Sequence, residues 1–125
     1  TGPYIQYMGA RASSIIRKHE GGEGNAAKGR ASPALLASDA DWAVIRRVSE
    51  LPEAVQAAAA AMEPSILAGY LHDLAADFST WYRDNPGLNN PDADLAASRL
   101  ELVRAVRRSF EAASALVCVP FLEVM

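Results

Sequence analysis

Two tyrosines and two basic residues recur along one face of the first predicted helix. Tyr4, Tyr7, Arg11 and Lys18 are separated by three, four and seven residues, and at about 100° per residue this spacing places them on one stripe. Tyrosine rings stack on unpaired bases, and arginine and lysine hold the neighbouring phosphates. The same pattern also suits tyrosines at the edge of a core, with solvent-exposed hydroxyls and a solvated basic rim. Spacing alone favours this second interpretation.

An apolar stripe lies about a quarter turn away on the same helix. Its members recur at intervals of three and four residues: Ile5, Met8, Ala12, Ile15 and Ile16. The pattern predicts a helix from about Pro3 to Lys18 or Glu20 with one face in a core. Thr1 or Gly2 can cap its start. Because the chain opens directly on this helix without an initiator methionine, we expect a fragment of a larger protein.

Residues with catalytic or metal-binding potential are few. The pair His72-Asp73 is similar to the paired ligands of metal phosphohydrolases, but such a site needs more ligands and His19 is the only other histidine. We therefore expect a polar pair on a helix surface, and we predict no catalytic residue and no metal ligand in this chain. The single Cys118 excludes an internal disulfide and a cysteine-rich metal site. We expect it to be buried as a small apolar side chain.

Arg99 falls near the middle of the apolar face of the last predicted helix. A charge in that position needs a partner. Asp73 and Asp77, on the preceding helix, are the candidate partners. We favour a structural ion pair here over a role in nucleic-acid binding.

The composition favours an all-α domain. Half of the 125 residues are hydrophobic, and many of these are alanine, the best helix former, while β-branched and aromatic residues do not alternate. The formal net charge of -3 argues against attachment to nucleic acid through overall charge, but it permits a local basic face. The sequence has no apolar run of about 18 residues and no signal-like start. We expect a cytoplasmic location and no membrane partner.

Helical periodicity, caps and prolines predict a compact bundle of five helices. We expect these helices at about residues 3–20, 38–51, 52–63, 64–83 and 92–116. Ser38 can cap the second helix, whose apolar side contains Trp42, Val44, Ile45, Val48 and Leu51. Arg46 and Arg47 should face solvent. The glycine-rich segment 21–33 predicts a mobile surface loop, and it lacks the flanking strand and the Gly-Lys-Ser/Thr sequence of a phosphate-binding loop.

The segments TGPYIQY (1–7) and ARASSIIRK (10–18) resemble the opening of the C-terminal anticodon-binding domain of arginyl-tRNA synthetases, which is of the DALR type. In that family a Gly-Pro-Tyr-apolar-Gln-Tyr run enters a helix with an Ala-Arg pair. The resemblance continues in order through LPEAV (51–55), EP (63–64), LAGYLHDLA (67–75), FSTWY (78–82), SRLELV (98–103) and the terminal methionine. It is weak over residues 21–37 and at Met8-Gly9, where the family commonly has Ala-His.

The resemblance implies that residues 1–125 are the anticodon-binding domain of a class I aminoacyl-tRNA synthetase. It implies that the RNA-binding residues are Tyr4, Tyr7, Arg11, Tyr82 and Met125. Their partner would be the anticodon loop of tRNA(Arg). The parent enzyme would attach arginine to this tRNA with ATP and Mg²⁺, through a catalytic domain that this chain lacks. No His-Ile-Gly-His-like or Lys-Met-Ser-Lys-like motif occurs in the 125 residues, so we expect the domain alone to hold no cofactor and to be inactive.

Two other functions fit the same residues. One is a non-catalytic helical module for interaction or regulation, which would not prefer arginine-accepting tRNA. The other is the same type of domain in another class I synthetase, such as the cysteinyl enzyme. The TGPYIQY opening and the terminal Met125 favour the arginyl enzyme.

Overall fold

The computed structural model describes residues 2–22, 24–85, 90–117 and 121–124, and every regular element within these ranges is helical. The α-helices are α1 (Gly2–Glu20), α2 (Asp39–Ser49), α3 (Leu51–Ala61), α4 (Pro64–Asp84) and α5 (Ala93–Leu116). Two short 3₁₀ helices, η1 (Ala26–Lys28) and η2 (Pro33–Leu35), lie between α1 and α2. The predicted all-α class and the predicted helices are confirmed.

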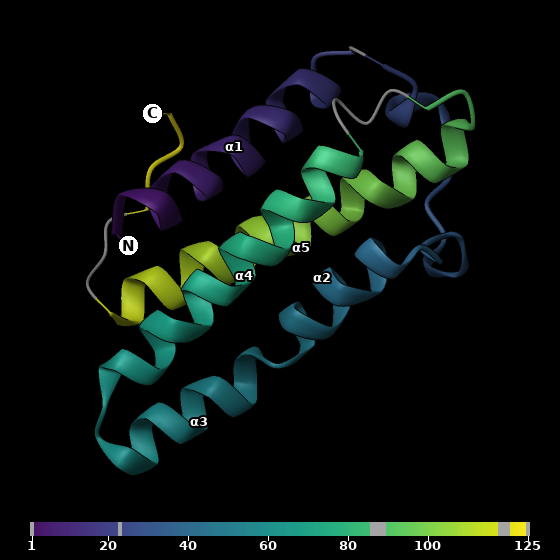
Figure 1. Cartoon of the computed structure of the whole chain (residues 1–125). Coiled ribbons are helices and arrows are strands. Elements are labelled where there is room, and N and C mark those ends of the chain that lie inside the picture. Colours follow the sequence, from purple (N-terminus) through teal and green to yellow (C-terminus); the bar gives the residue numbers. More distant parts are fainter. Residues whose placement is uncertain (1, 23, 86–89, 118–120, 125) are drawn as a thin grey trace.

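The bundle has α4 and α5 in its middle, with α1 on one side of them and the consecutive helices α2 and α3 on the other (Figure 1). The core between these layers is apolar. Its largest fully buried apolar side chains are Val44, Leu71, Leu74, Phe78, Trp81, Val103, Val106 and Phe110. The apolar stripe predicted for α1 is buried in the same core. None of the described helices is long and apolar enough to cross a membrane.

Helix α2 begins after its predicted cap, Ser38. In its first turn the side chain of Asp41 is buried, whereas that of Trp42, which was expected to face the core, is exposed. The Ser38 hydroxyl accepts a hydrogen bond from the Asp41 amide at 3.0 Å, and Asp41 Oδ2 accepts one from the Ser38 amide at 3.3 Å. Val44 is fully buried as predicted. Trp42 is 56% exposed, so its placement on the apolar side was wrong. Asp41 is fully buried, because the cap and a neighbouring helix satisfy its carboxylate.

The buried Asp41 carboxylate connects three helices. Its Oδ1 accepts a hydrogen bond from Trp81 Nε1 of α4 at 2.7 Å, and Arg99 Nε of α5 lies 3.7 Å from the same oxygen. Arg99 therefore forms a structural ion pair, as predicted, but the predicted partners Asp73 and Asp77 were wrong. Both of those carboxylates lie beside a cation of α2 instead.

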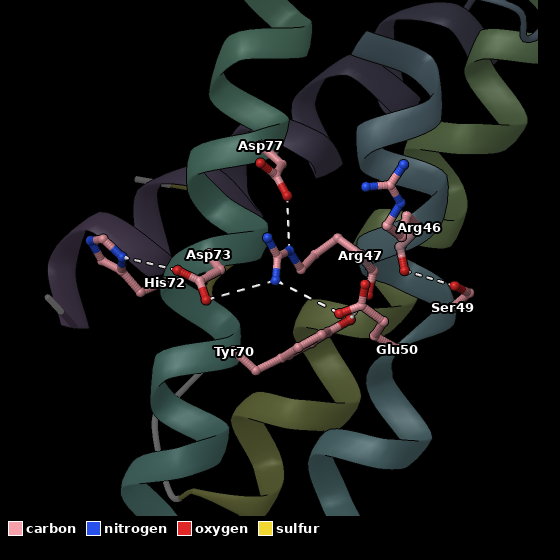
Figure 2. A network of polar contacts seen from close by, with 8 residues as sticks. All are labelled: Arg46, Arg47, Ser49, Glu50, Tyr70, His72, Asp73 and Asp77. Atoms are coloured by element: carbon pink, nitrogen blue, oxygen red, sulfur yellow. Dashed lines mark hydrogen bonds and ion pairs between the residues drawn. The ribbon is translucent and has the colours of Figure 1, made fainter. Parts of the chain in front are cut away.

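That cation is Arg47, which joins α2 to α4 near the surface (Figure 2). Its Nε donates a hydrogen bond to Asp77 Oδ2 at 2.8 Å, and its Nη1 lies 3.7 Å from Asp73 Oδ2 and 3.9 Å from Glu50 Oε2. The hydrogen bond to Asp77 raises the pKa of Arg47 above its ordinary value. Arg46 is exposed as predicted. Arg47 is only partly exposed, so its prediction as a solvent-facing residue was wrong.

The glycine-rich segment after α1 is anchored on α5. Asn25 Nδ2 donates to the Asn90 carbonyl at 2.7 Å, and the Ser32 amide donates to Ser98 Oγ at 2.8 Å. A Cβ atom at Gly29 would lie 1.8 Å from the Ala93 carbonyl oxygen, so only glycine allows this approach. Most of the described residues of this segment are exposed, as predicted for a surface loop, and its small residues also allow close packing on α5.

We expect Asp41→Asn to lower the free energy of unfolding by about 3 kcal/mol, because it leaves the largely buried Arg99, whose side chain is 15% exposed, without a counter-charge. Urea denaturation measures this loss. The matched control is Asp39→Asn in the exposed first turn of the same helix, where loss of the charge should cost only a few tenths of a kcal/mol. Equal effects of the two substitutions would contradict a stabilising role for the buried pair.

Tyr70 lies beneath the Arg47 network, and its hydroxyl donates to the Arg47 carbonyl at 2.5 Å (Figure 2). Burial raises the pKa of Tyr70 to about 12, against an opposing effect of the Arg47 charge. The ordinary pKa of tyrosine is about 10. The stability linked to this shift is therefore complete below pH 10, and it is lost as the pH rises from about 10 to 12.

We expect the wild-type chain to be more stable than Tyr70→Phe by about 1 kcal/mol at pH 8, where the hydrogen bond is intact. The difference should narrow by pH 11, because the phenol then ionises in the unfolded wild type, whereas burial keeps it largely protonated in the folded chain. Urea denaturation of both proteins at the two pH values measures the change, and the other tyrosines cancel in the comparison. If the stability difference between wild type and Tyr70→Phe is the same at both pH values, the raised pKa of Tyr70 does not contribute to the stability of the chain.

Candidate nucleic-acid interface

A cleft of about 300 Å³ lies between α1, the end of α4 and the C-terminal segment of residues 121–124. Helix α4 contributes Tyr82, and the C-terminal segment contributes Glu123 and Val124. The remaining wall comes from one side of α1, and its residues are Tyr7, Ala10, Arg11, Ser14, Ile15, Arg17 and Lys18. Three of the four residues in the stripe predicted for the first helix, Tyr7, Arg11 and Lys18, thus line one side of a solvent-open concavity.

Arg11 contacts both aromatic rings of this cleft. Its guanidinium carbon lies 5.0 Å from the centre of the Tyr7 ring and 4.5 Å from the centre of the Tyr82 ring, and its Nη2 donates to the Tyr7 hydroxyl. Both distances suit cation–π attraction. Tyr7 is 45% exposed. The cleft therefore carries a planar cation and two ring faces that an unpaired base could use.

Helix α4 directs Tyr82 into the cleft through its neighbour Trp81. Trp81 is fully buried, stacks on Phe78 with ring centres 5.7 Å apart, and donates its indole N–H to Asp41. Consecutive helical residues point about 100° apart. Because the buried indole determines how the end of α4 is rotated, the next side chain faces α1.

Tyr4 lies outside the cleft, one turn before Tyr7. Its ring contacts His72 of α4 at 5.7 Å, and its hydroxyl donates to the Ala75 carbonyl at 3.4 Å. The structure does not bring it together with Tyr7, Arg11 and Tyr82. For Tyr4, the surroundings match those of a tyrosine at the edge of a core.

Met125 lies outside the described residues, although Glu123 and Val124 line the cleft just before it. Sequence reasoning did not identify Arg17, whose Nη1 donates to the Glu123 carbonyl at 3.2 Å. Its position beside the cleft depends on the path of the C-terminal segment, which no local pattern predicts.

The charges at the cleft are mainly positive. Arg11, Arg17 and Lys18 line it, and among the described lining residues Glu123 is the one acidic side chain, with its carboxylate paired to Arg107 of α5. A local basic surface is thus present on a chain with a net charge of -3. Among residues 2–22, 24–85, 90–117 and 121–124, no three His, Cys, Asp or Glu side chains gather as a metal site would require. Aromatic faces beside cations suit binding of a nucleic-acid strand.

His72 and Asp73 are both exposed, and His72 Nδ1 lies 4.0 Å from Asp73 Oδ1 (Figure 2). This matches the polar pair that the sequence predicted on a helix surface. The nearest aromatic contact of this pair is Tyr4, whose ring lies against His72. The pair is separate from the cleft.

A basic cleft with aromatic faces at the edge of a helical bundle suits the binding of an unpaired nucleic-acid strand. The model of the DALR anticodon binding domain matches residues 5–125. The chain therefore belongs to the DALR anticodon binding domain family. This confirms the family that the sequence motifs indicated.

Three proteins to which the chain is similar are arginine–tRNA ligases. The arginine–tRNA ligase of Treponema denticola is 44% identical over 127 residues, and that of Treponema pallidum is 45% identical over 129 residues; each match covers all of this chain and 22% of the relative. The arginine–tRNA ligase of Korarchaeum cryptofilum is 38% identical over 125 residues, covering all of this chain and 19% of the relative. The chain spans about a fifth of the length of these curated relatives.

Proposed function

We propose that this chain is the anticodon-binding domain of an arginine–tRNA ligase, and that its cleft binds the anticodon loop of tRNA(Arg). Relatives with that name match the chain over its whole length. The observation that carries the proposal is the convergence of Tyr7, Arg11 and Tyr82 on one open cleft. These residues come from two helices, and their side chains offer the stacking and charge that an unpaired RNA loop needs.

In the proposed complex, an unstacked anticodon base enters beside Arg11 and stacks on Tyr7 or Tyr82. The guanidinium then turns toward a phosphate or the edge of a base, where it can form two parallel hydrogen bonds. Lys18 is exposed at the cleft and holds a backbone phosphate. Met125 follows the lining residues Glu123 and Val124, and we propose that it adds an apolar wall.

Tyr4 has a peripheral part in this proposal. It is 37% exposed and lies one helical turn before Tyr7 on the same side of α1. A loop that extends beyond the cleft would meet its ring next. Its contribution to affinity should therefore be smaller than that of Tyr7.

The parent enzyme in this proposal joins arginine to its tRNA with ATP and Mg²⁺ in the cytoplasm. The chain corresponds to about a fifth of such an enzyme, so the catalytic domain is a further partner within the same polypeptide. The proposal assigns none of the residues 1–125 to catalysis or to metal binding. The domain alone should neither activate arginine nor hydrolyse ATP, because its sequence contains no His-Ile-Gly-His-like or Lys-Met-Ser-Lys-like motif.

The test is a comparison of two RNAs, tRNA(Arg) and the same tRNA with its anticodon changed. We expect the wild-type chain to prefer the native anticodon at low salt. Tyr7→Ala should weaken binding of tRNA(Arg) about tenfold, because one stacked base loses its platform. Fluorescence anisotropy with labelled tRNA measures both affinities.

The control for this substitution is Trp42→Ala, which removes an exposed aromatic side chain from α2, on the far side of α4 and α5 from α1 (Figure 1). It should leave the affinity unchanged. Equal binding of both RNAs would reject anticodon recognition and favour a helical interaction module. Preference for tRNA(Cys) over tRNA(Arg) would indicate a domain of the cysteinyl type.

Lys18→Ala should weaken binding and reduce the dependence of log K on log salt by about 0.7, the value for one phosphate contact on a single strand. RNA-binding titrations at salt concentrations from about 50 to 200 mM measure this slope. Lys28→Ala is the matched control, because Lys28 is an exposed lysine of η1 that does not line the cleft. If both substitutions change the slope equally, Lys18 makes no specific contact with a phosphate of the RNA.

A further inference from the structure

Gly9 is buried in the middle of α1, where the ring of Phe121 lies against it. A Cβ atom at this position would come within 2.9 Å of Phe121 Cε2 and 3.4 Å of Phe121 Cδ2. The shorter distance is closer than carbon atoms normally approach, so a methyl group here would displace the ring. The missing side chain of Gly9 is therefore the space that Phe121 occupies.

Phe121 begins the segment that forms one wall of the cleft. The Arg107 guanidinium of α5 lies 5.9 Å from the centre of its ring and also pairs with the Glu123 carboxylate. The Glu123 carbonyl accepts a hydrogen bond from Arg17 of α1 at 3.2 Å. The segment is thus held at Phe121 and at Glu123, and Glu123 and Val124 face Tyr7 and Tyr82 across the cleft.

We propose that Gly9 is a positioning residue for the RNA-binding cleft. By admitting the Phe121 ring against α1, it sets where the segment of residues 121–124 lies, and so sets the width of the cleft. This inference rests on the proposed function for its effect on RNA. It assigns to Gly9 no contact with RNA itself.

If Gly9 had no effect on the cleft, its replacement by alanine would affect only the stability of the helix. Glycine inside a helix is destabilising relative to alanine. If nothing else depended on Gly9, alanine there would stabilise the chain and leave the cleft unchanged. Gly69 of α4 provides the matched case, since a Cβ atom there would meet nothing within 4 Å.

The experiment compares Gly9→Ala with Gly69→Ala in the 125-residue chain. We expect Gly9→Ala to weaken binding of tRNA(Arg) about fivefold, the lower end of what loss of one stacked base costs. Gly69→Ala should raise the thermal unfolding midpoint and leave the affinity unchanged. Equal affinity of Gly9→Ala and wild type, or equal loss in both variants, would overturn the inference.

A second variant separates the Phe121 contact from other effects of the methyl group. Phe121→Ala opens the space that the ring fills, so it should weaken binding by itself. In that background, Gly9→Ala should have no further effect on affinity and should stabilise the chain as Gly69→Ala does. A fivefold loss from Gly9→Ala that persists without the Phe121 ring would contradict the mechanism.

A readout without RNA distinguishes this inference from the proposed function. In NMR spectra of the free chain, Gly9→Ala should shift the Glu123 amide and Val124 methyl signals, and Gly69→Ala should not. If those signals shift but the wild type shows no anticodon preference, the positioning role holds and the proposed function fails. If the wild type prefers the native anticodon and the signals stay unchanged, Gly9 has no positioning role.

Discussion

The hydrogen bond from the Trp81 indole to the buried Asp41 carboxylate constrains the rest of this bundle. A carboxylate in an apolar core is costly unless donors and a counter-charge surround it. Here the donors come from the cap of α2 and from α4, and the counter-charge, Arg99, comes from α5. Three helices must therefore adopt the rotations that bring these groups together. Because Tyr82 follows Trp81 on α4, the same contact determines which way Tyr82 faces.

The cleft is built between elements, so its chemistry depends on their packing. Tyr7 and Arg11 belong to α1, Tyr82 to α4, and Glu123 to the C-terminal segment. Arg11, Arg17 and Lys18 line this cleft, and most of the acidic side chains lie on other surfaces, which reconciles a net charge of -3 with a local basic site. In the free chain, Arg11 occupies the space between the rings. In the proposed complex, a base that stacks on either ring would therefore displace this guanidinium.

Sequence patterns predicted the helices well because periodicity, caps and prolines are local signals. They placed α1 within a residue or two of its observed ends and identified Ser38 as a cap. They were wrong where the local pattern allowed either of two adjacent side chains to face the core. Trp42 and Asp41 are adjacent, and hydrophobicity alone favoured burying the indole, yet the carboxylate is inside because Trp81 and Arg99 satisfy it.

The sequence by itself determined the helical class, the boundaries of the helices and, through its motifs, the family. It also placed Tyr7, Arg11 and Lys18 on one stripe, because residues three to four apart on a helix share a face. The resemblance assigned Tyr82 to the same site, and the tertiary structure brings its ring against Arg11. Only the tertiary structure decided that Tyr4 packs on His72 outside the cleft and that Phe121 fills the space at Gly9. These contacts link residues far apart in the chain, and their geometry follows from how whole helices pack.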